Sequence, residues 1–458
     1  MPQERPGTPD SEAGLKKQLS AGQMAMVGVG GSIGTGLLMG SGAAIPIAGP
    51  AVILSFVLAA AITWTVTMAL GEMASTHPAA GSFGVYAELY LNPWAGFISR
   101  YGYWVAIAIA IGGEMVAAAT CMRLWAPQVP ALAWVALFSA LLIALNLRTV
   151  GDLGRFEYWF AMFKLVTILA FVVVGAALLL GRHVPPQYAA QGGFFPQGRL
   201  APLLAMSFSL FTFAGIEMVA ISSGEARAVR EIPRAVRLTF GLLGFVYLGA
   251  IAVLVGVMPW NGVARDVSES PFVTVFQHVG VPAASHVMNF VVLTAALSGA
   301  NASLYVDSRM LFSLARGGYA PAVFGRLNKS GSPMAALLVS SFGVVLALAM
   351  EKWAPKSAYV YLIGAALFGA MLAWLVALAA HMVFRRRLTP QQLAALPMRS
   401  PGGAWLSAAG FVAIVISLIA TWWYSRITVL SGVLYLVVLS AAYLAARRPK
   451  SRNGIAGN

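Results

Sequence analysis

The chain has 458 residues, of which 59% are hydrophobic and only 10% carry charge. Soluble domains contain about 25% charged residues, so this composition excludes an ordinary soluble domain and predicts an all-α polytopic membrane protein. The one cysteine and five histidines show neither a disulfide framework nor metal-ligand spacing, so we expect no metal and no cofactor.

Twelve apolar segments are long enough to cross a bilayer, since a spanning helix needs about 20 residues. In chain order the predicted spans are residues 21–44, 51–75, 95–119, 131–149, 157–181, 202–223, 237–258, 284–305, 334–350, 357–382, 405–422 and 428–446.

The basic residues gather in alternate loops between these segments. If the N-terminus is inside, the segments on the inside contain roughly three times as many Lys and Arg residues as those on the outside. This bias predicts that both tails, residues 1–20 and 447–458, are cytoplasmic. It also explains the net charge of +15 without a nucleic-acid partner.

Residues 28–42, inside the first segment, include seven glycines. Each glycine in a helix interior costs about 1 kcal/mol relative to alanine, so the stretch predicts a break in the first span. Lipid cannot satisfy the backbone groups that a break exposes, whereas a bound solute can. A half-helix starting near Gly34 would direct its amides at an anion such as a carboxylate. The alternative is that the small residues only allow close helix packing.

Four ionisable residues stand out in or at the end of predicted spans: Glu114 in the third, Lys164 in the fifth, Glu217 in the sixth and Asp307 at the end of the eighth. A charge at the bilayer centre costs at least about 2.5–3.5 kcal/mol, so each requires a role. Gly215 beside Glu217 predicts a second break. Breaks in spans one and six indicate a five-plus-five inverted repeat with a site at the membrane midplane. The alternative for Glu217 is a hydrogen bond that joins neighbouring helices.

The other three charges leave several roles open. Lys164 lies about 10 Å into its segment, where it could extend to the cytoplasmic surface. If it stays buried, desolvation favours the neutral amine and makes it a candidate proton carrier. Glu114 could contact substrate, pair with a cation or pack between helices. We expect Asp307 to form an ion pair with Arg309 at the cytoplasmic edge.

Residues 224–237 form a basic loop in which Arg227, Arg230, Arg234 and Arg237 follow helical spacing. The apolar residues with matching spacing are Ala226, Val229, Pro233 and Val236. This pattern predicts a short amphipathic helix on the anionic inner leaflet, so the bilayer is an expected partner. The alternative is a solvated loop.

Several motifs, in order along the chain, resemble those of the bacterial amino acid transporter family in the amino acid–polyamine–organocation superfamily. The resemblance covers about residues 15–448. The motifs that carry it occupy residues 30–42, 48–50, 71–73, 81–83, 156–164, 215–217, 224–226, 259–260, 304–305, 308–311 and 317–321.

The resemblance implies twelve transmembrane helices in a five-plus-five inverted repeat with broken helices one and six. The first repeat would cover residues 21–182 and the second residues 183–382, followed by spans eleven and twelve in residues 383–446. It further implies secondary active transport of amino acids across the bacterial inner membrane.

The same resemblance implies the site residues. In the family the first-span break receives the substrate carboxylate, here Ser32, Ile33, Gly34, Thr35 and Gly36. Carbonyls of the sixth-span break receive the ammonium, here around Phe211, Ala214 and Gly215. Phe211 matches the aromatic that closes over substrate, with Phe213 a neighbour. Glu217 matches the family acid, and Glu114 joins the substrate-binding candidates.

Lys164 matches a fifth-span lysine that, in proton-coupled relatives, occupies the sodium position of sodium-driven relatives. This favours H+ as the coupling ion, with Lys164 and Glu217 as the proton-coupling candidates.

We therefore expect a proton-coupled importer of a neutral or hydrophobic L-amino acid that works by alternating access. The alternatives are a cationic amino acid permease, an amino acid exchanger or a membrane amino acid sensor. No cluster with nucleophile or metal geometry is present in the sequence, so we do not expect an enzyme. The sequence does not indicate the oligomeric state.

Overall fold

The computed structural model describes residues 17–79, 81–146, 150–262, 270–278, 282–328, 331–355, 358–424 and 426–446. Most of both predicted tails, residues 1–16 and 447–458, lies outside this part of the chain. The helices are α1 (Ala21–Ser32), the π-helix Gly36–Gly40, α2 (Ser41–Ala48), α3 (Val52–Thr76), α4 (Ser82–Tyr90), α5 (Pro93–Met122), α6 (Ala131–Asn146), α7 (Val150–Leu180), α8 (Ala201–Thr212), α9 (Met218–Ile221), α10 (Glu231–Val257), α11 (Pro271–His278), α12 (Pro282–Arg316), α13 (Met334–Ser340), α14 (Phe342–Trp353), α15 (Ala358–Arg387), α16 (Pro390–Ala394), α17 (Gly403–Tyr424) and α18 (Arg426–Ala446).

Among the described residues, 8 helical stretches are long and apolar enough to cross a membrane. They are Ala21–Thr76, Pro93–Met122, Tyr158–Leu180, Glu231–Val257, Ala283–Arg316, Met334–Trp353, Tyr361–Arg387 and Gly403–Trp423. The first has 56 residues and contains two of the predicted segments, while three shorter apolar helices cover further predicted spans. The chain is therefore an all-helical, multi-pass membrane protein.

The first and sixth predicted spans are interrupted near their middles. Helix α1 ends at Ser32, and the π-helix begins at Gly36 after a bend at Ile33 and Gly34. Helix α8 ends at Thr212, and the four-residue α9 begins only at Met218. Both interruptions lie in the glycine-containing stretches where the sequence predicts them.

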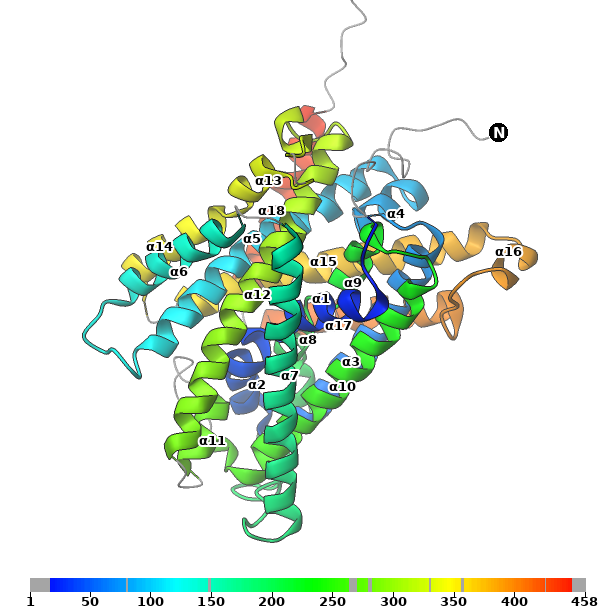
Figure 1. Ribbon diagram of the computed structural model, residues 1–458. Helices are drawn as coiled ribbons and strands as arrows, with labels where there is room; N and C mark the ends of the chain where they lie inside the picture. Colours follow the sequence, from blue (N-terminus) through cyan, green and yellow to red (C-terminus); the bar gives the residue numbers. More distant parts are fainter. Residues whose placement is uncertain are drawn as a thin grey trace, which may run out of the picture.

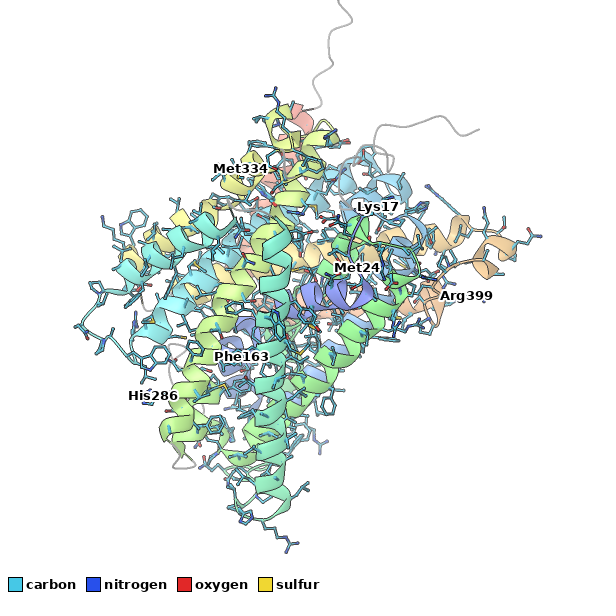
Figure 2. All side chains as sticks on the ribbon, in the orientation of Figure 1. Lys17, Met24, Phe163, His286, Met334 and Arg399 are labelled. Atoms are coloured by element: carbon cyan, nitrogen blue, oxygen red, sulfur yellow. The ribbon has the colours of Figure 1, made fainter. Side chains whose placement is uncertain are left out.

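The helices pack around the interrupted segments. Helices α3 and α10 run side by side near α1, and α5 packs against α12, α14 and α15 (Figure 1). A Cβ atom at Gly343 of α14 would overlap the carbonyl oxygen of Ala108 on α5, so glycine brings these two backbones into contact. Figure 2 shows Met24 of α1 inside the bundle, where it is 0% exposed, whereas Phe163 on the outer face of α7 is 42% exposed.

The apolar stretch of α7, Tyr158–Leu180, agrees with the predicted fifth span, although the helix itself begins earlier, at Val150. The side chain of Lys164 is 0% exposed. This burial excludes the alternative in which the ammonium extends to the cytoplasmic surface.

Helix α12 overturns the predicted Asp307–Arg309 pair. The helix runs on to Arg316, so Asp307 lies inside it and is 0% exposed. Arg309 instead pairs with Glu225, with 3.1 Å between Nε and Oε1, and its guanidinium stacks 3.4 Å above the ring of Tyr305. Residues two apart on a helix point in different directions, which explains why the sequence neighbours do not pair.

The basic loop differs from the predicted amphipathic helix. Helix α10 begins at Glu231, so Arg227 and Arg230 precede it. Pro233 and Val236 are buried within the protein, because this apolar face packs on the bundle rather than on lipid. The exposed residues are Arg227, Val229, Arg230, Arg234 and Arg237.

Candidate functional site

The two helix breaks meet at Gly215. Its φ of +103° is one that L side chains rarely adopt. A Cβ atom there would lie 2.7 Å from the carbonyl carbon of Gly31 and 2.8 Å from the amide nitrogen of Ser32. Glycine is therefore required for the backbones of the first and sixth spans to touch.

Side chains from three other helices satisfy the carbonyl oxygens around the first break. The Lys164 ammonium on α7 donates to Gly30 at 2.7 Å. The Tyr247 hydroxyl on α10 donates to the Ser32 carbonyl at 2.6 Å, and the Tyr359 hydroxyl on α15 donates to the Thr35 carbonyl at 3.1 Å. Since lipid offers no such donors, these contacts satisfy the carbonyl groups and stabilise the broken conformation of the segment.

Glu114 on α5 occupies the amide side of the same break. The Thr35 amide donates to both carboxylate oxygens of Glu114, at 3.3 and 3.4 Å. This amide faces the carboxylate at the start of the helical stretch, where backbone N–H groups favour an anion. Lys164 is near enough to Glu114 to interact with it electrostatically. The structure thus places an internal carboxylate where the sequence predicts that of the substrate.

Glu217 braces the second break. The Gly215 amide donates to both its carboxylate oxygens at 3.1 Å. The Tyr103 hydroxyl on α5 donates to Oε1 at 2.8 Å, and the Trp374 indole on α15 donates to Oε2 at 3.2 Å. The side chain is 1% exposed. Glu217 therefore joins α5, α15 and the broken span, in agreement with the helix-joining role.

A small cavity lies between the two breaks. Seven of the predicted substrate-binding residues line it: Ser32, Gly34, Gly36, Glu114, Phe211, Ala214 and Gly215. Among the described residues the Ser32 hydroxyl finds no hydrogen-bond partner, although Ser32 is only 3% exposed. The cavity therefore combines the backbone of two breaks with the side chains of two serines, Ser32 and Ser303, and the carboxyl group of Glu114.

The other four predicted residues support the cavity from outside. Ile33 and Phe213 are fully buried, and the Phe213 ring lies 4.9 Å from that of Tyr247 and 6.5 Å from that of Phe56. Thr35 contributes its backbone groups to the contacts above. Glu217 acts on the second break rather than lining the cavity.

Sequence reasoning missed the remaining wall, which consists mainly of small residues on α5, α12 and α15. The missed lining residues are Gly31, Ile107, Ala110, Met218, Ser303, Ala366 and Ala370. Alanines in apolar helices carry no signal that separates a cavity from a helix contact. Tyr103, Tyr247, Tyr359 and Trp374 were also missed, although polar aromatic groups within spans require hydrogen-bond partners.

Within the part of the chain that the structure describes, no group of three or more His, Cys, Asp or Glu could hold a metal ion. The cavity offers backbone donors and acceptors to a small dipolar solute.

Comparison with known proteins identifies the family. The amino acid permease family model matches residues 23–452. The chain belongs to the amino acid permease family. This permease is 35% identical to the gamma-aminobutyric acid permease of Bacillus subtilis (strain 168), over 98% of this chain and 97% of that protein. It is 34% identical to the aromatic amino acid transport protein AroP of Escherichia coli O6:H1, over 94% and 95% of the two chains.

Solved structures show the same fold. The permease is similar to a mutant form of a manganese transporter of Eremococcus coleocola, with a TM-score of 0.59 and 15% identity. The match covers 93% of each chain. At that identity the likeness concerns the fold alone. As an amino acid permease of the amino acid–polyamine–organocation superfamily, the protein is a transporter and not an enzyme.

Replacing Gly215 with alanine should separate the two breaks. The strained φ alone costs about 1–3 kcal/mol, and the added Cβ atom also displaces the backbone at Gly31. We expect Gly215→Ala to lower thermal stability in detergent and to abolish amino acid binding. The control is Gly241→Ala on α10, where nothing lies within 4 Å of the added atom. Equal stability and binding in the two variants would show that the breaks do not depend on this contact.

Proposed function

We propose that this permease is a secondary active importer of a neutral or hydrophobic L-amino acid, coupled to protons. The observation that carries the proposal is the contact of two broken helices beside a cavity whose amide end already holds a carboxylate. That geometry suits a zwitterion, because the two breaks offer backbone donors and acceptors on opposite sides of the cavity.

In the proposed complex the substrate carboxylate lies at the amides of Ser32–Gly36. The ammonium lies at carbonyls of Phe211 and Ala214, with the Phe211 ring over the substrate. The side-chain end of the cavity is lined by uncharged residues, namely Ile107, Ala110, Ser303, Ala366 and Ala370. This lining supports an uncharged side chain. Relatives are named for transport of gamma-aminobutyric acid and of aromatic amino acids.

Glu114 provides the proposed link between substrate and proton. Its carboxylate and the substrate carboxylate would share the Thr35 amide, and two negative charges at this site repel each other. Protonation of Glu114 removes the repulsion, so substrate and proton binding favour each other. By linkage each raises the affinity of the site for the other to the same extent.

Lys164 is the second proposed proton-coupling group. Its ammonium holds the Gly30 carbonyl at the first break, so loss of its proton would weaken the contact and loosen the broken segment. For each proton that enters, a pH difference of one unit across the membrane supplies about 1.4 kcal/mol, and a membrane potential of 100 mV supplies about 2.3 kcal/mol. Together these would sustain a gradient of several hundredfold for a neutral solute. Glu217 is a further proton-coupling candidate, because a proton on its carboxylate would weaken the contacts to Gly215, Tyr103 and Trp374 that join the helices.

We further propose the finer topology: twelve spans, repeats in residues 21–182 and 183–382, and both termini in the cytoplasm of a bacterial cell. The exposed Arg227, Arg230, Arg234 and Arg237 would then lie at the anionic inner leaflet.

Transport is tested in proteoliposomes with a panel of radiolabelled amino acids that includes phenylalanine and gamma-aminobutyric acid. With acid outside, we expect the wild-type protein to accumulate a neutral amino acid above equilibrium. Lys164→Gln keeps a donor for Gly30 but cannot carry a charge, so gradient-driven uptake should fall at least about tenfold. The control is Lys352→Gln, which replaces an exposed lysine and should leave gradient-driven uptake unchanged.

Other outcomes contradict the proposal in distinct ways. Uptake that requires an amino acid preloaded inside and ignores the proton gradient would identify an exchanger. Binding without any uptake would identify a sensor.

Substrate affinity tests the role of Glu114. In the wild-type protein we expect the dissociation constant to fall as pH falls, because protonation frees the Thr35 amide. The change should be roughly 5- to 150-fold, the usual range for coupled sites. In Glu114→Gln the dissociation constant should stay near the low-pH wild-type value at every pH. A variant with unchanged pH dependence would assign the linkage elsewhere.

Labelling of single cysteines tests the orientation, since native Cys121 is buried. A membrane-impermeant maleimide should label Arg234→Cys only in inside-out vesicles and Lys352→Cys only in right-side-out vesicles. The reverse pattern would overturn the cytoplasmic placement of the termini.

A further inference from the structure

One face of α15 runs from the cavity to the other end of the helix. Ala366 and Ala370 line the cavity, and Trp374 donates to Glu217 one turn further along. His381 and Arg385 follow on the same face, since all five positions fall within about 100° of one another at 3.6 residues per turn. The face extends about 29 Å along the helix. The cavity wall and the far end of α15 are therefore connected by one continuous helix.

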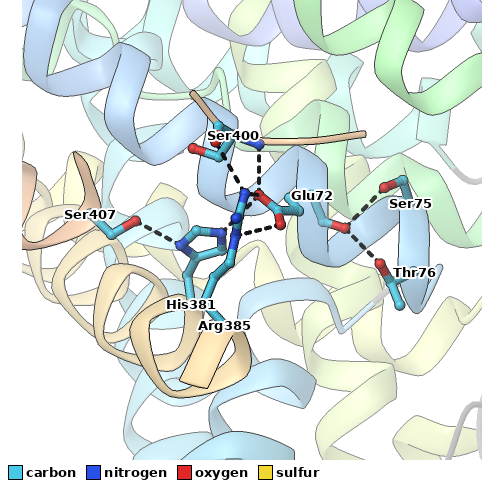
Figure 3. A network of polar contacts seen from close by, with 7 residues as sticks. All are labelled: Glu72, Ser75, Thr76, His381, Arg385, Ser400 and Ser407. Atoms are coloured by element: carbon cyan, nitrogen blue, oxygen red, sulfur yellow. Dashed lines mark hydrogen bonds and ion pairs between the residues drawn. The ribbon is translucent and has the colours of Figure 1, made fainter. Parts of the chain in front are cut away.

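The far end of this face is fixed to α3 by Glu72 (Figure 3). The Glu72 carboxylate accepts hydrogen bonds from Arg385 Nη2 at 2.8 Å and contacts His381 Nε2 at 3.2 Å. Arg385 Nε lies 2.7 Å from the second carboxylate oxygen. Glu72 and His381 are 0% exposed. The ion pair therefore joins two long helices inside the protein.

The same groups hold the chain that leads into α17. The Ser400 amide donates to Glu72 at 2.7 Å, and Arg385 donates to the Ser400 carbonyl at 3.0 Å. The Ser407 hydroxyl lies 2.7 Å from His381 Nδ1 (Figure 3). Three segments distant in sequence thus converge on one carboxylate. We call this group of residues the Glu72 network: Glu72, His381, Arg385, Ser400 and Ser407.

The position of the network suggests its role. A buried ion pair contributes little net stability, because desolvation offsets the attraction, but its directional contacts specify one arrangement of its helices. In the observed alignment of α15 against α3, one carboxylate oxygen of Glu72 is contacted by Arg385, His381 and the Ser400 amide. That alignment also places Trp374 on Glu217 and the alanines on the cavity.

We propose that Glu72, His381 and Arg385 are positioning residues for transport: they set α15 against α3 and so shape the substrate cavity through Ala366, Ala370 and Trp374. The proposal rests on the proposed function for its transport readout. In this proposal the Glu72 network controls substrate affinity although it lies at a distance from the cavity.

The first experiment needs no substrate. Ala370→Cys places a thiol in the cavity wall, and its rate of reaction with a small methanethiosulfonate reagent reports the position of α15. The parent protein provides the background, since Cys121 is 5% exposed. We expect Glu72→Gln to change this rate about fivefold or more, the lower range of coupling between linked sites.

The matched control is Glu351→Gln, which removes another largely buried carboxylate from an ion pair with Arg123 that does not involve α15. We expect it to leave the reaction rate unchanged. Equal rates in Glu72→Gln and its parent would overturn the proposal. If the wild-type protein transports nothing while the rates still differ, only the proposed function fails.

Kinetics per folded protein separate positioning from stability. We expect Glu72→Gln to raise KM for the transported amino acid about tenfold. The double variant Glu72→Gln/Trp374→Phe should have a KM no higher than that of the single variant with the higher KM, because both changes act through the same face of α15. Additive effects on KM, or a loss confined to folded yield, would contradict positioning.

Conservative variants guard against misfolding. His381→Gln keeps a donor for Glu72 and should keep KM near the wild-type value, whereas His381→Phe should raise it. If both His381 variants show wild-type KM, His381 is not a positioning residue and the proposal fails in that part.

Discussion

The bilayer contains no water to satisfy a broken helix, and the arrangement of this permease depends on that constraint. At the first break the carbonyls of Gly30, Ser32 and Thr35 each receive a side-chain donor from a different helix. The breaks could not persist without α7, α10 and α15 in these positions. The cavity between the breaks is therefore a product of the whole bundle rather than of the two broken spans alone.

Glu114 and Glu217 show how two buried carboxyl groups acquire different roles. Glu217 receives donors on both oxygens from three segments, so it is held in place as part of the framework. Glu114 accepts from the Thr35 amide alone among the described residues, and it faces the cavity. A group with few fixed partners can change its contacts when a ligand arrives, whereas a fully satisfied group resists change.

Much of the fold could be predicted from the sequence because membrane insertion leaves strong signals. Long apolar segments, glycine-rich breaks and isolated charges marked the spans, both interruptions and the buried Lys164. The sequence could not show which charges meet, since Arg309 pairs with Glu225 from a distant loop rather than with nearby Asp307. Nor could it separate alanines that line a cavity from alanines that pack, because the two have the same composition.

The glycine contact between α5 and α14 has a consequence for motion. Backbones that touch at Gly343 and Ala108 cannot slide past each other without first moving apart. Helix α5, whose part of the cavity wall carries Ile107, Ala110 and Glu114, is therefore tied to α14, and the two helices would move as one unit in the proposed transport.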